Sequence, residues 1–166
     1  AAAKAKEILG ILPNKVEIFA SGNIIKNVKS VIVPNTNGMK GIKASVAVGI
    51  IAGDPNKALE VIANVTDEQK IETQNFLDTT PISVHHINSD EQLDVTVKLF
   101  YDEHNASVRI SGFHTNIVSI QKDNNTIFES NTISAPTKEL TDRSVLSVEG
   151  IYDFANSVDL DDIKDV

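Results

Sequence analysis

The chain has 166 residues, of which 41% are apolar and 23% charged, a composition typical of a soluble globular protein. Its net charge of −8 argues against nucleic acid or a membrane surface as a partner, and no apolar run approaches the roughly 18 residues of a membrane span. The sequence contains no cysteine, which excludes disulfides, thiolate zinc sites and a cysteine-ligated iron–sulfur cluster within this chain, and we expect a cytoplasmic protein.

The N-terminal part of the chain is predicted to hold one helix and a pair of strands. Residues 1–10 favour a helix that Gly10 ends at its C′ position, with Pro13 shortly after it. Because this segment starts without a Met or a capping residue, it is typical of the second half of a helix, and we expect the chain to be a fragment of a longer protein. The alternation and β-branching of Lys15–Ala20 and Lys29–Val33 predict two short strands.

Helical patterns dominate the next forty residues. The segment Gly41–Ala52 is apolar or small nearly all round, which predicts a helix that is buried on most sides. Pro55 favours the first turn of a following helix over Asn56–Asn64. The residues Thr66–Gln69 form a capping box, which predicts another helix to about Asp78.

From Pro81 onward the apolar period changes from about 3.6 to 2, which favours strands. The alternating segments are most simply an antiparallel meander of four or five strands with one face packed on helices. They are Ile82–Ile87, Leu93–Tyr101, Ala106–Gly112, Ile117–Lys122 and Thr126–Glu129. After a polar connection, Ser144–Asn156 is predicted to form a last helix.

These elements predict an α+β fold, in which a helical layer packs on the antiparallel sheet and a short strand pair lies near the N-terminus. We expect one unit over residues 1–166. Its first 80 residues are mainly helical, residues 81–130 form the sheet, and residues 144–156 form the last helix.

The stretch Val33–Gly41 is the first candidate for a binding site. A glycine-rich turn that leads into a helix presents free backbone N–H groups and the positive end of the helix dipole. Lys40 in the first turn of that helix is unfavourable by a few tenths of a kcal/mol, and a bound anion would relieve this. The alternative is a plain turn in which Asn37 caps the helix and Lys40 points to solvent.

Two polar tripeptides are further candidates. Ser21-Gly22-Asn23 follows a predicted strand and could place a hydroxyl and an amide near the same helix start, or it could simply be a turn. His114-Thr115-Asn116 could supply hydrogen bonds and a titrating imidazole, or it could be a bulge with outward polar side chains. Neighbouring histidines at 85 and 86 point to opposite faces of a strand, so we predict no metal site.

Three stretches together resemble a known family. They are SGNIIKN at 21–27, PNTNGMKGIKASVAVGIIAGDPNKALEVIANVT at 34–66, and SGFHTNIV at 111–118. In order and approximate spacing they are similar to the L-cysteine desulfidases, relatives of the iron–sulfur L-serine dehydratase α chain. The likeness runs over most of residues 1–150.

The resemblance implies a lyase that converts L-cysteine to pyruvate, ammonia and sulfide, or L-serine to pyruvate and ammonia. Family members are longer at both ends and hold a [4Fe–4S] cluster on cysteines in those outer parts, where an open iron acts as Lewis acid. This cysteine-free chain departs from that pattern. We therefore expect no cofactor in this chain, the cluster in a full-length parent protein, and no activity from the chain alone.

The resemblance also implies roles for the candidate residues. The carboxylate of an amino-acid substrate would be held by the two turns, and His114 or Lys40 would move a proton. The substrate-binding candidates are Ser21, Gly22, Asn23, Asn35, Thr36, Gly38, Thr115 and Asn116.

Two hypotheses follow for the function. In the first, the chain is part of a lyase whose partners are a small amino acid and the rest of the parent polypeptide. In the second, the chain is a non-catalytic module that binds an amino acid or forms a homodimer through its sheet.

Overall fold

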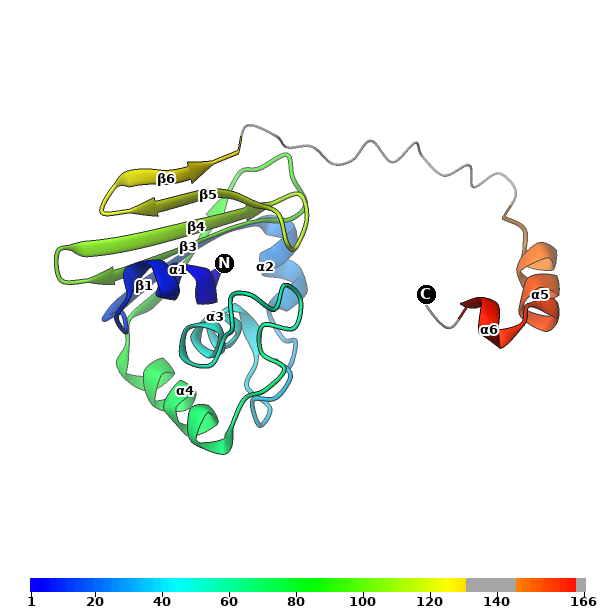
Figure 1. Ribbon diagram of the computed structural model, residues 1–166, viewed down its shortest axis with the longest axis horizontal. Coiled ribbons are helices and arrows are strands. Elements are labelled where there is room, and N and C mark those ends of the chain that lie inside the picture. Colours follow the sequence, from blue (N-terminus) through cyan, green and yellow to red (C-terminus); the bar gives the residue numbers. More distant parts are fainter. Residues whose placement is uncertain (131–145, 164–166) are drawn as a thin grey trace. The chain divides into compact units, whose positions relative to one another are not determined.

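The computed structural model describes residues 1–130 and 146–163 (Figure 1). The chain divides into two compact units, Ala1–Ile133 and Ser134–Val166, and each has its own structure. The larger unit is α+β, as predicted, and contains all the candidate site residues.

A six-stranded mixed sheet forms the larger unit's framework, with the order β2-β1-β3-β4-β5-β6. From β3 onward the strands are an antiparallel meander, as predicted. Strand β1 lies between β2, to which it is parallel, and β3, to which it is antiparallel. The strands are β1 (Lys15–Ser21), β2 (Ile82–Ile87), β3 (Asp94–Tyr101), β4 (His104–Ser111), β5 (Ile117–Lys122) and β6 (Asn125–Glu129).

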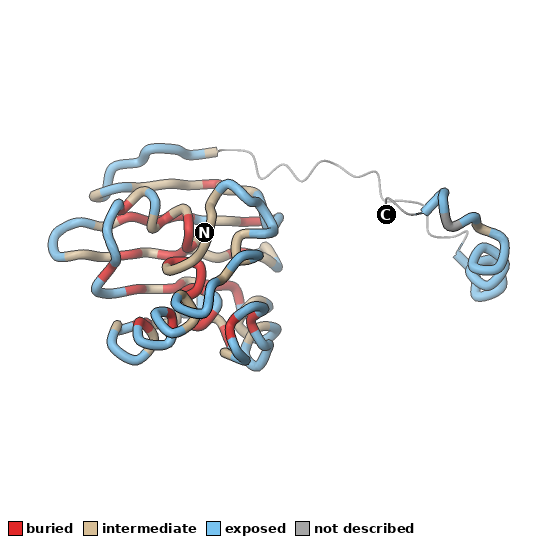
Figure 2. The backbone as a smooth tube through the Cα atoms, turned by 60° about the horizontal axis from the view of Figure 1, so that its bottom comes forward, coloured by how far each residue is buried: buried red, intermediate tan, exposed pale blue. Residues whose placement is uncertain are grey.

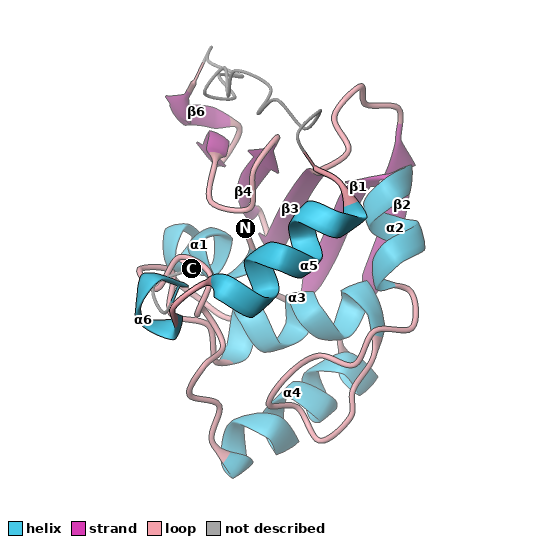
Figure 3. Ribbon diagram, turned by 90° about the vertical axis from the view of Figure 1, so that its right-hand side faces the viewer, coloured by secondary structure: helices cyan, strands magenta, loops and turns pink. Residues whose placement is uncertain are grey.

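Helices cover one face of this sheet (Figure 3). The first helix contacts β3 and β4 directly, the third packs against the first, and the fourth against the third. The second helix follows β1 without a break and contacts β1 and β2. These helices are α1 (Ala2–Leu9), α2 (Gly22–Val28), α3 (Gly41–Ile51) and α4 (Asp67–Thr79).

The main core lies between the sheet and the helices, where the buried segments gather in Figure 2. Alternate strand residues point into it, because successive side chains of a strand face opposite sides. Val16 and Ile18 of β1 lie opposite Leu99 and Val97 of β3, and all four are buried. The helices contribute Leu9, Val46, Ala47, Ile50 and Phe76.

Local sequence signals account for three of the helices. Gly10 ends α1 in the left-handed conformation, with φ of 83°, and its N–H donates to the Lys6 carbonyl. The capping box at the start of α4 is present in full, between Thr66 and Gln69. Helix α3 buries residues on several sides, as its apolar composition predicted.

The strand predicted over Lys29–Val33 is wrong, so the N-terminal strand pair does not exist. Ile32 makes a single bridge to Lys40, and the side chain of Ile32 is exposed. The backbone bonds of this segment close a local loop, from the Val33 N–H to the Met39 carbonyl and from the Gly41 N–H to the Val31 carbonyl. A short apolar run without a sheet neighbour therefore became the stem of a turn.

The helix predicted over Asn56–Asn64 is also wrong. This segment is a series of turns, in which the Asn56 N–H donates to the Asp54 carboxylate. Ala58 has φ of 43°, outside the right-handed helical region, so the helix favoured by Pro55 does not propagate.

The prediction of a purely antiparallel sheet of four or five strands is wrong in two details. The sheet has six strands because Lys15–Ser21 joins it, and β2 pairs with β1 in parallel. The sequence pattern identified both segments as strands, but alternation alone does not specify which strands become neighbours.

The smaller unit contains α5 (Val148–Ser157) and α6 (Leu160–Ile163). Helix α5 corresponds to the predicted last helix, whose first residues, 144 and 145, lie outside the described ranges. The Ser147 hydroxyl accepts a hydrogen bond from the Gly150 N–H and caps α5. Several apolar side chains of α5 are exposed, including Val148, Ile151 and Tyr152.

Candidate functional site

The first and last family-like stretches meet at one end of the sheet. Strands β1 and β4 both end there, and β3 begins there. The Ser21 hydroxyl donates to the Gln92 carbonyl at 2.7 Å, and the Gly112 N–H donates to the next carbonyl, that of Leu93, at 2.9 Å. The Gln92–Leu93 backbone therefore joins the SGN and SGFHTN segments.

The SGN tripeptide begins a helix where the sequence favoured a turn or break. Ser21 is the residue before α2, and Gly22 and Asn23 form its first turn. Asn23 donates from its amide to the Gln92 carbonyl at 3.3 Å. A Cβ atom on Gly22 would lie 3.2 Å from the Nε2 atom of His86, so this glycine allows a close approach of the imidazole.

The turn before α3 uses most of its polar groups to hold its own shape. The Thr36 side chain is buried, and its hydroxyl donates to the Val33 carbonyl at 2.6 Å. Asn35 has φ of 59° and donates from its amide to the Ile62 carbonyl at 3.0 Å. Asn37 and Gly38 also have positive φ, at 56° and 89°. The sequence of the turn is thus explained by its geometry.

Lys40 lies one residue before α3, not in the first turn, and its side chain is exposed. Helix α3 has no side-chain cap, so of the plain-turn alternative the exposed Lys40 is found, but capping by Asn37 is not. Gly41 adopts φ of 86°, and a Cβ atom there would lie 3.3 Å from the Lys29 carbonyl oxygen. Glycine is therefore required where the chain enters the helix.

The HTN tripeptide lies in the loop between β4 and β5. Asn116 stabilises this loop by donating from its amide to the Ser111 carbonyl at 2.8 Å. His114 and Thr115 are exposed and line a cavity of about 500 Å³ on the helical side of the sheet, which we call the helical-side cavity. Other lining residues are Ala1, Lys4, Ser45, Gly49, Leu59 and Ile117.

Sequence reasoning missed a charged groove on the other face of the sheet. The side chain of Asp94, at the start of β3, is only 1% exposed. It accepts two hydrogen bonds from Arg109 on β4, at 3.0 Å from Nε and 2.7 Å from Nη2, and one from the Ser89 hydroxyl at 2.8 Å. This bidentate geometry fixes the guanidinium against the sheet.

The pKa of both partners reflects this pairing. Burial alone would raise the pKa of Asp94, but hydrogen bonds from Arg109 and Ser89, with the charge on Arg109, hold it below its ordinary value. The hydrogen bond to Asp94 raises the pKa of Arg109 above its already high value. Both groups are therefore charged at neutral pH.

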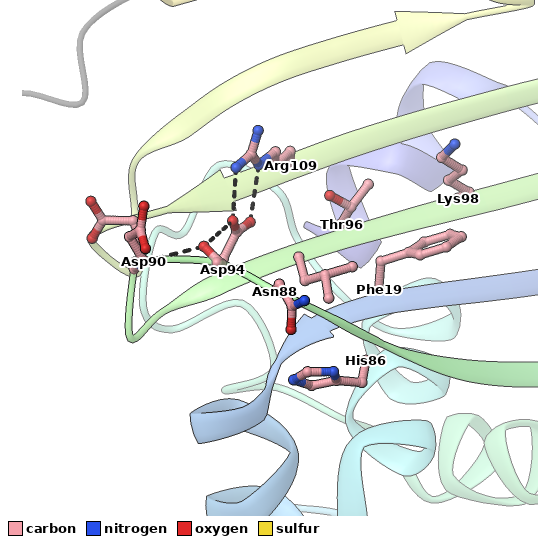
Figure 4. A pocket seen from close by; sticks show the side chains of 11 residues that line it. Phe19, His86, Asn88, Asp90, Asp94, Thr96, Lys98 and Arg109 are labelled. Atoms are coloured by element: carbon pink, nitrogen blue, oxygen red, sulfur yellow. Dashed lines mark hydrogen bonds and ion pairs between the residues drawn. The ribbon is translucent and has the colours of Figure 1, made fainter.

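Around this ion pair the groove has a volume of about 860 Å³, and we call it the open-face groove (Figure 4). Phe19, Thr96 and Lys98 form its floor together with Arg109, and the loop between β2 and β3 forms one wall. The wall residues are Ile87, at the end of β2, and Asn88, Ser89, Asp90 and Glu91 of the loop.

The only sequence signal for this groove is the position of its charges. Asp94 and Arg109 occupy polar positions of two predicted strands, but nothing in the sequence gives the register that places them side by side. Among residues 1–130 and 146–163, no three His, Asp or Glu side chains lie close enough to hold a metal ion. In the same ranges, no helix is long and apolar enough to cross a membrane.

One buried side-chain oxygen, at the end of β4, has no hydrogen-bond partner among the described residues. The side chain of Ser111 is buried, and its hydroxyl has no hydrogen-bond partner among the described residues. Buried hydroxyls are normally paired, so the Ser111 hydroxyl at the end of β4 is an exception to this rule.

Comparison with known proteins gives relatives of similar sequence but without a named activity. The chain is 46% identical to a UPF0597 protein of Desulfitobacterium hafniense (strain Y51) over 165 residues, which is 99% of this chain and 38% of the relative. It is 46% identical to a UPF0597 protein of Fusobacterium nucleatum, covering 100% of this chain and 39% of the relative. For a UPF0597 protein of Finegoldia magna the identity is 45%, and the match covers 40% of the relative.

No family model and no solved structure matches the chain. The chain spans 38 to 40% of the length of these curated relatives. Over nearly its whole length it is therefore similar to one part of the UPF0597 proteins.

Proposed function

We propose that this chain is the substrate-binding part of a cytoplasmic lyase that eliminates sulfide from L-cysteine, or water from L-serine. The observation that carries the proposal is the placement of His114 and Thr115 on a cavity of about 500 Å³. That volume is sufficient for a small amino acid. The likeness of the SGN, PNTNG and HTN stretches to L-cysteine desulfidases supports the same reading.

The residues present do not fit the iron–sulfur cluster of that family. The sequence has no cysteine, and thiolates are the usual ligands of such clusters. The cluster would have to be held by other parts of a longer protein. The role of this chain is then to bind the substrate and to move protons.

His114 is the better candidate for the base because it lines the cavity, whereas Lys40 does not. A neutral imidazole can accept the α-proton of the substrate while the bond from the β-carbon to sulfur or oxygen breaks. Thr115, which lines the same cavity, carries a hydroxyl that can donate a hydrogen bond to the substrate carboxylate, whereas the Ser45 hydroxyl already donates to the Gly41 carbonyl. The buried hydroxyl of Thr36 and the amide of Asn35 are engaged within the turn and play a supporting role.

The test is a pyruvate assay on the full-length protein, reconstituted anaerobically with iron and sulfide. We expect His114→Gln to lower kcat for L-cysteine or L-serine by about 100-fold or more, the range for loss of an acid–base group. Lys40→Gln is the matched control and should retain most of the activity. An active His114→Gln enzyme would refute this assignment, and the absence of pyruvate from both substrates in the unmodified protein would refute the lyase.

A second candidate function is dimerisation through the sheet. Strand β6 is the outer strand, and no other strand of the described residues pairs with its free edge. All of its residues are exposed, including Ile127 and Phe128, and such an edge can pair with the same strand of another copy. Sedimentation should then show a dimer that Ile127→Lys dissociates, whereas a monomer at high concentration would exclude it.

A further inference from the structure

We propose that the open-face groove is a second ligand site, which binds a free α-amino acid in its zwitterionic form. The groove lies on the face of the sheet opposite to His114, so this site does not depend on the lyase chemistry. Its two sides carry opposite charge, and each side matches one end of such a ligand.

The floor of the groove provides the groups for a carboxylate. Arg109 is held by Asp94 through Nε and Nη2, which leaves Nη1 without a hydrogen-bond partner among the described residues. Its side chain is 45% exposed. Lys98, the second cation, forms no ion pair within residues 1–130 and 146–163. Thr96 lies between them, because it is opposite Arg109 in the register and two residues from Lys98.

These cations are fixed before any ligand arrives. The Arg109 guanidinium is oriented by a buried carboxylate, and the Lys98 ammonium lies 5.3 Å from the centre of the Phe19 ring. Less side-chain entropy is therefore lost when an anion binds between them.

The wall of the groove provides the groups for an ammonium. Asp90 and Glu91 lie on the loop between β2 and β3 and line the groove, and neither forms an ion pair within the described ranges. Ser89 holds this loop in place, since its hydroxyl donates to Asp94 and accepts from the Glu91 N–H at 3.2 Å. Figure 4 shows Asp90 on this loop, at the end of the groove where Asp94 meets Arg109.

The same charges argue against other small ligands. A phosphate or other simple anion would meet Asp90 and Glu91 as well as the cations, and like charges are repelled. A flat aromatic ligand would need a free ring to stack on, but His85 stacks on the Phe19 ring at 4.9 Å and Lys98 also lies over that ring. A ligand of both signs fits the groove best.

Calorimetric titration of the 166-residue chain tests this site, with glycine, L-serine and L-cysteine as probes. Pyruvate keeps the carboxylate without the amine, and ethylamine keeps the amine without the carboxylate. We expect saturable binding of at least one amino acid and binding of pyruvate and ethylamine that is weaker by about tenfold or more, as expected for the loss of one charge-assisted contact.

Variants locate the binding. Lys98→Gln should weaken it about tenfold, and the same loss is expected from the double change Asp90→Asn and Glu91→Gln. Lys15→Gln is the matched control, because the Lys15 ammonium lies 4.9 Å from the centre of the Phe100 ring but outside the groove. Arg109→Lys is a further test that keeps a charge beside Asp94.

Each result decides for or against the groove. Absence of saturable binding, or pyruvate binding as tightly as the amino acids, would overturn the proposal. Binding that His114→Ala abolishes and Lys98→Gln leaves unchanged would place the amino acid in the helical-side cavity instead. That outcome would refute this inference while leaving the lyase proposal intact.

Discussion

The two cavities of the larger unit lie on opposite faces of one sheet and differ in how they are built. The helical-side cavity has mainly apolar walls from α1, α3 and the turns after α3, with His114 and Thr115 at its rim. The open-face groove is lined by charged side chains and has an ion pair at its base. The first places an imidazole and a hydroxyl beside apolar walls, and the second suits recognition of a charged ligand in water.

The difference shows what each kind of site requires of the fold. The two candidate residues of the helical-side cavity, His114 and Thr115, come from one contiguous motif, in which the Asn116 side chain holds the loop. The groove requires strand register, since Asp94 and Arg109 meet only because β3 and β4 pair as they do. The segment Gln92–Leu93 connects the two sites. It directly follows the wall of the open-face groove, and its carbonyls accept hydrogen bonds from Ser21 and Gly112 of the family-like stretches.

The largest effect is expected from breaking the ion pair of the groove. Arg109→Ala leaves the buried Asp94 carboxylate without its main partner, and we expect a loss of about 2 to 3 kcal/mol in the free energy of unfolding, measured with urea, because the Arg109 side chain is 45% exposed. Arg109→Lys should lose less, because one charge-assisted contact remains. If Arg109→Ala is as stable as the unmodified chain, the ion pair does not anchor the open face.

Low pH should also destabilise the chain, because it protonates Asp94 and so weakens the same ion pair. The pKa of Asp94 is lower in the folded than in the unfolded chain, so its contribution to stability is complete above the unfolded value of about 3.9 and is lost as pH falls through the folded value. Between pH 5 and 2, Asp94→Asn should therefore lose less free energy of unfolding than the unmodified chain. If the free energy of unfolding falls equally with pH in both proteins, the Asp94 carboxylate is not stabilised by Arg109.

On the helical side of the sheet, a substitution in the turn before α3 should lower the free energy of unfolding by a smaller amount. Thr36→Val keeps the shape of the buried side chain but removes the 2.6 Å hydrogen bond to the Val33 carbonyl. We expect a loss of about 1 to 2 kcal/mol in urea unfolding, the cost of one buried hydrogen bond with an unsatisfied partner. Thr115→Val is the control, because Thr115 is exposed at the cavity rim. A turn that tolerates Thr36→Val unchanged would have to be held by its neighbours alone.

The smallest effect is expected at Ser111, the last residue of β4, where a substitution should increase the stability of the fold. Ser111→Ala removes a buried hydroxyl that has no partner among the described residues, and we expect an increase of about 0.5 to 1 kcal/mol. Thermal unfolding of Ser111→Ala beside Ser107→Ala measures it, since the Ser107 hydroxyl does have a partner in Gln121. Destabilisation by Ser111→Ala would indicate that a water molecule or a ligand satisfies this hydroxyl.

Local chemistry explains how much the sequence could predict. The end of α1 at Gly10, the capping box of α4 and the strand at Ile82–Ile87 depend on neighbouring residues and were all predicted. The strand predicted at Lys29–Val33 and the helix predicted at Asn56–Asn64 failed because no partner strand was available to the first, and a positive φ at Ala58 interrupts the second.

The candidate site was predictable only in part, for a related reason. The motifs identified His114 and Thr115, which line the helical-side cavity, but they equally identified Asn35 and Thr36, whose side chains hold a turn. A sequence cannot distinguish a polar group that binds a ligand from one that binds the chain itself. The open-face groove was missed because its residues come together only through strand pairing.

The parallel pairing of β1 and β2 has a consequence for the order in which the chain folds. Residues 22–81, with α2, α3 and α4, separate these adjacent strands, whereas short turns join β3, β4, β5 and β6. Closing the long connection costs more chain entropy than closing a hairpin. The meander should therefore acquire protection from hydrogen exchange first, and β2 last, so that Thr96, Lys98 and Arg109 of the groove floor are in place before β2 joins the sheet.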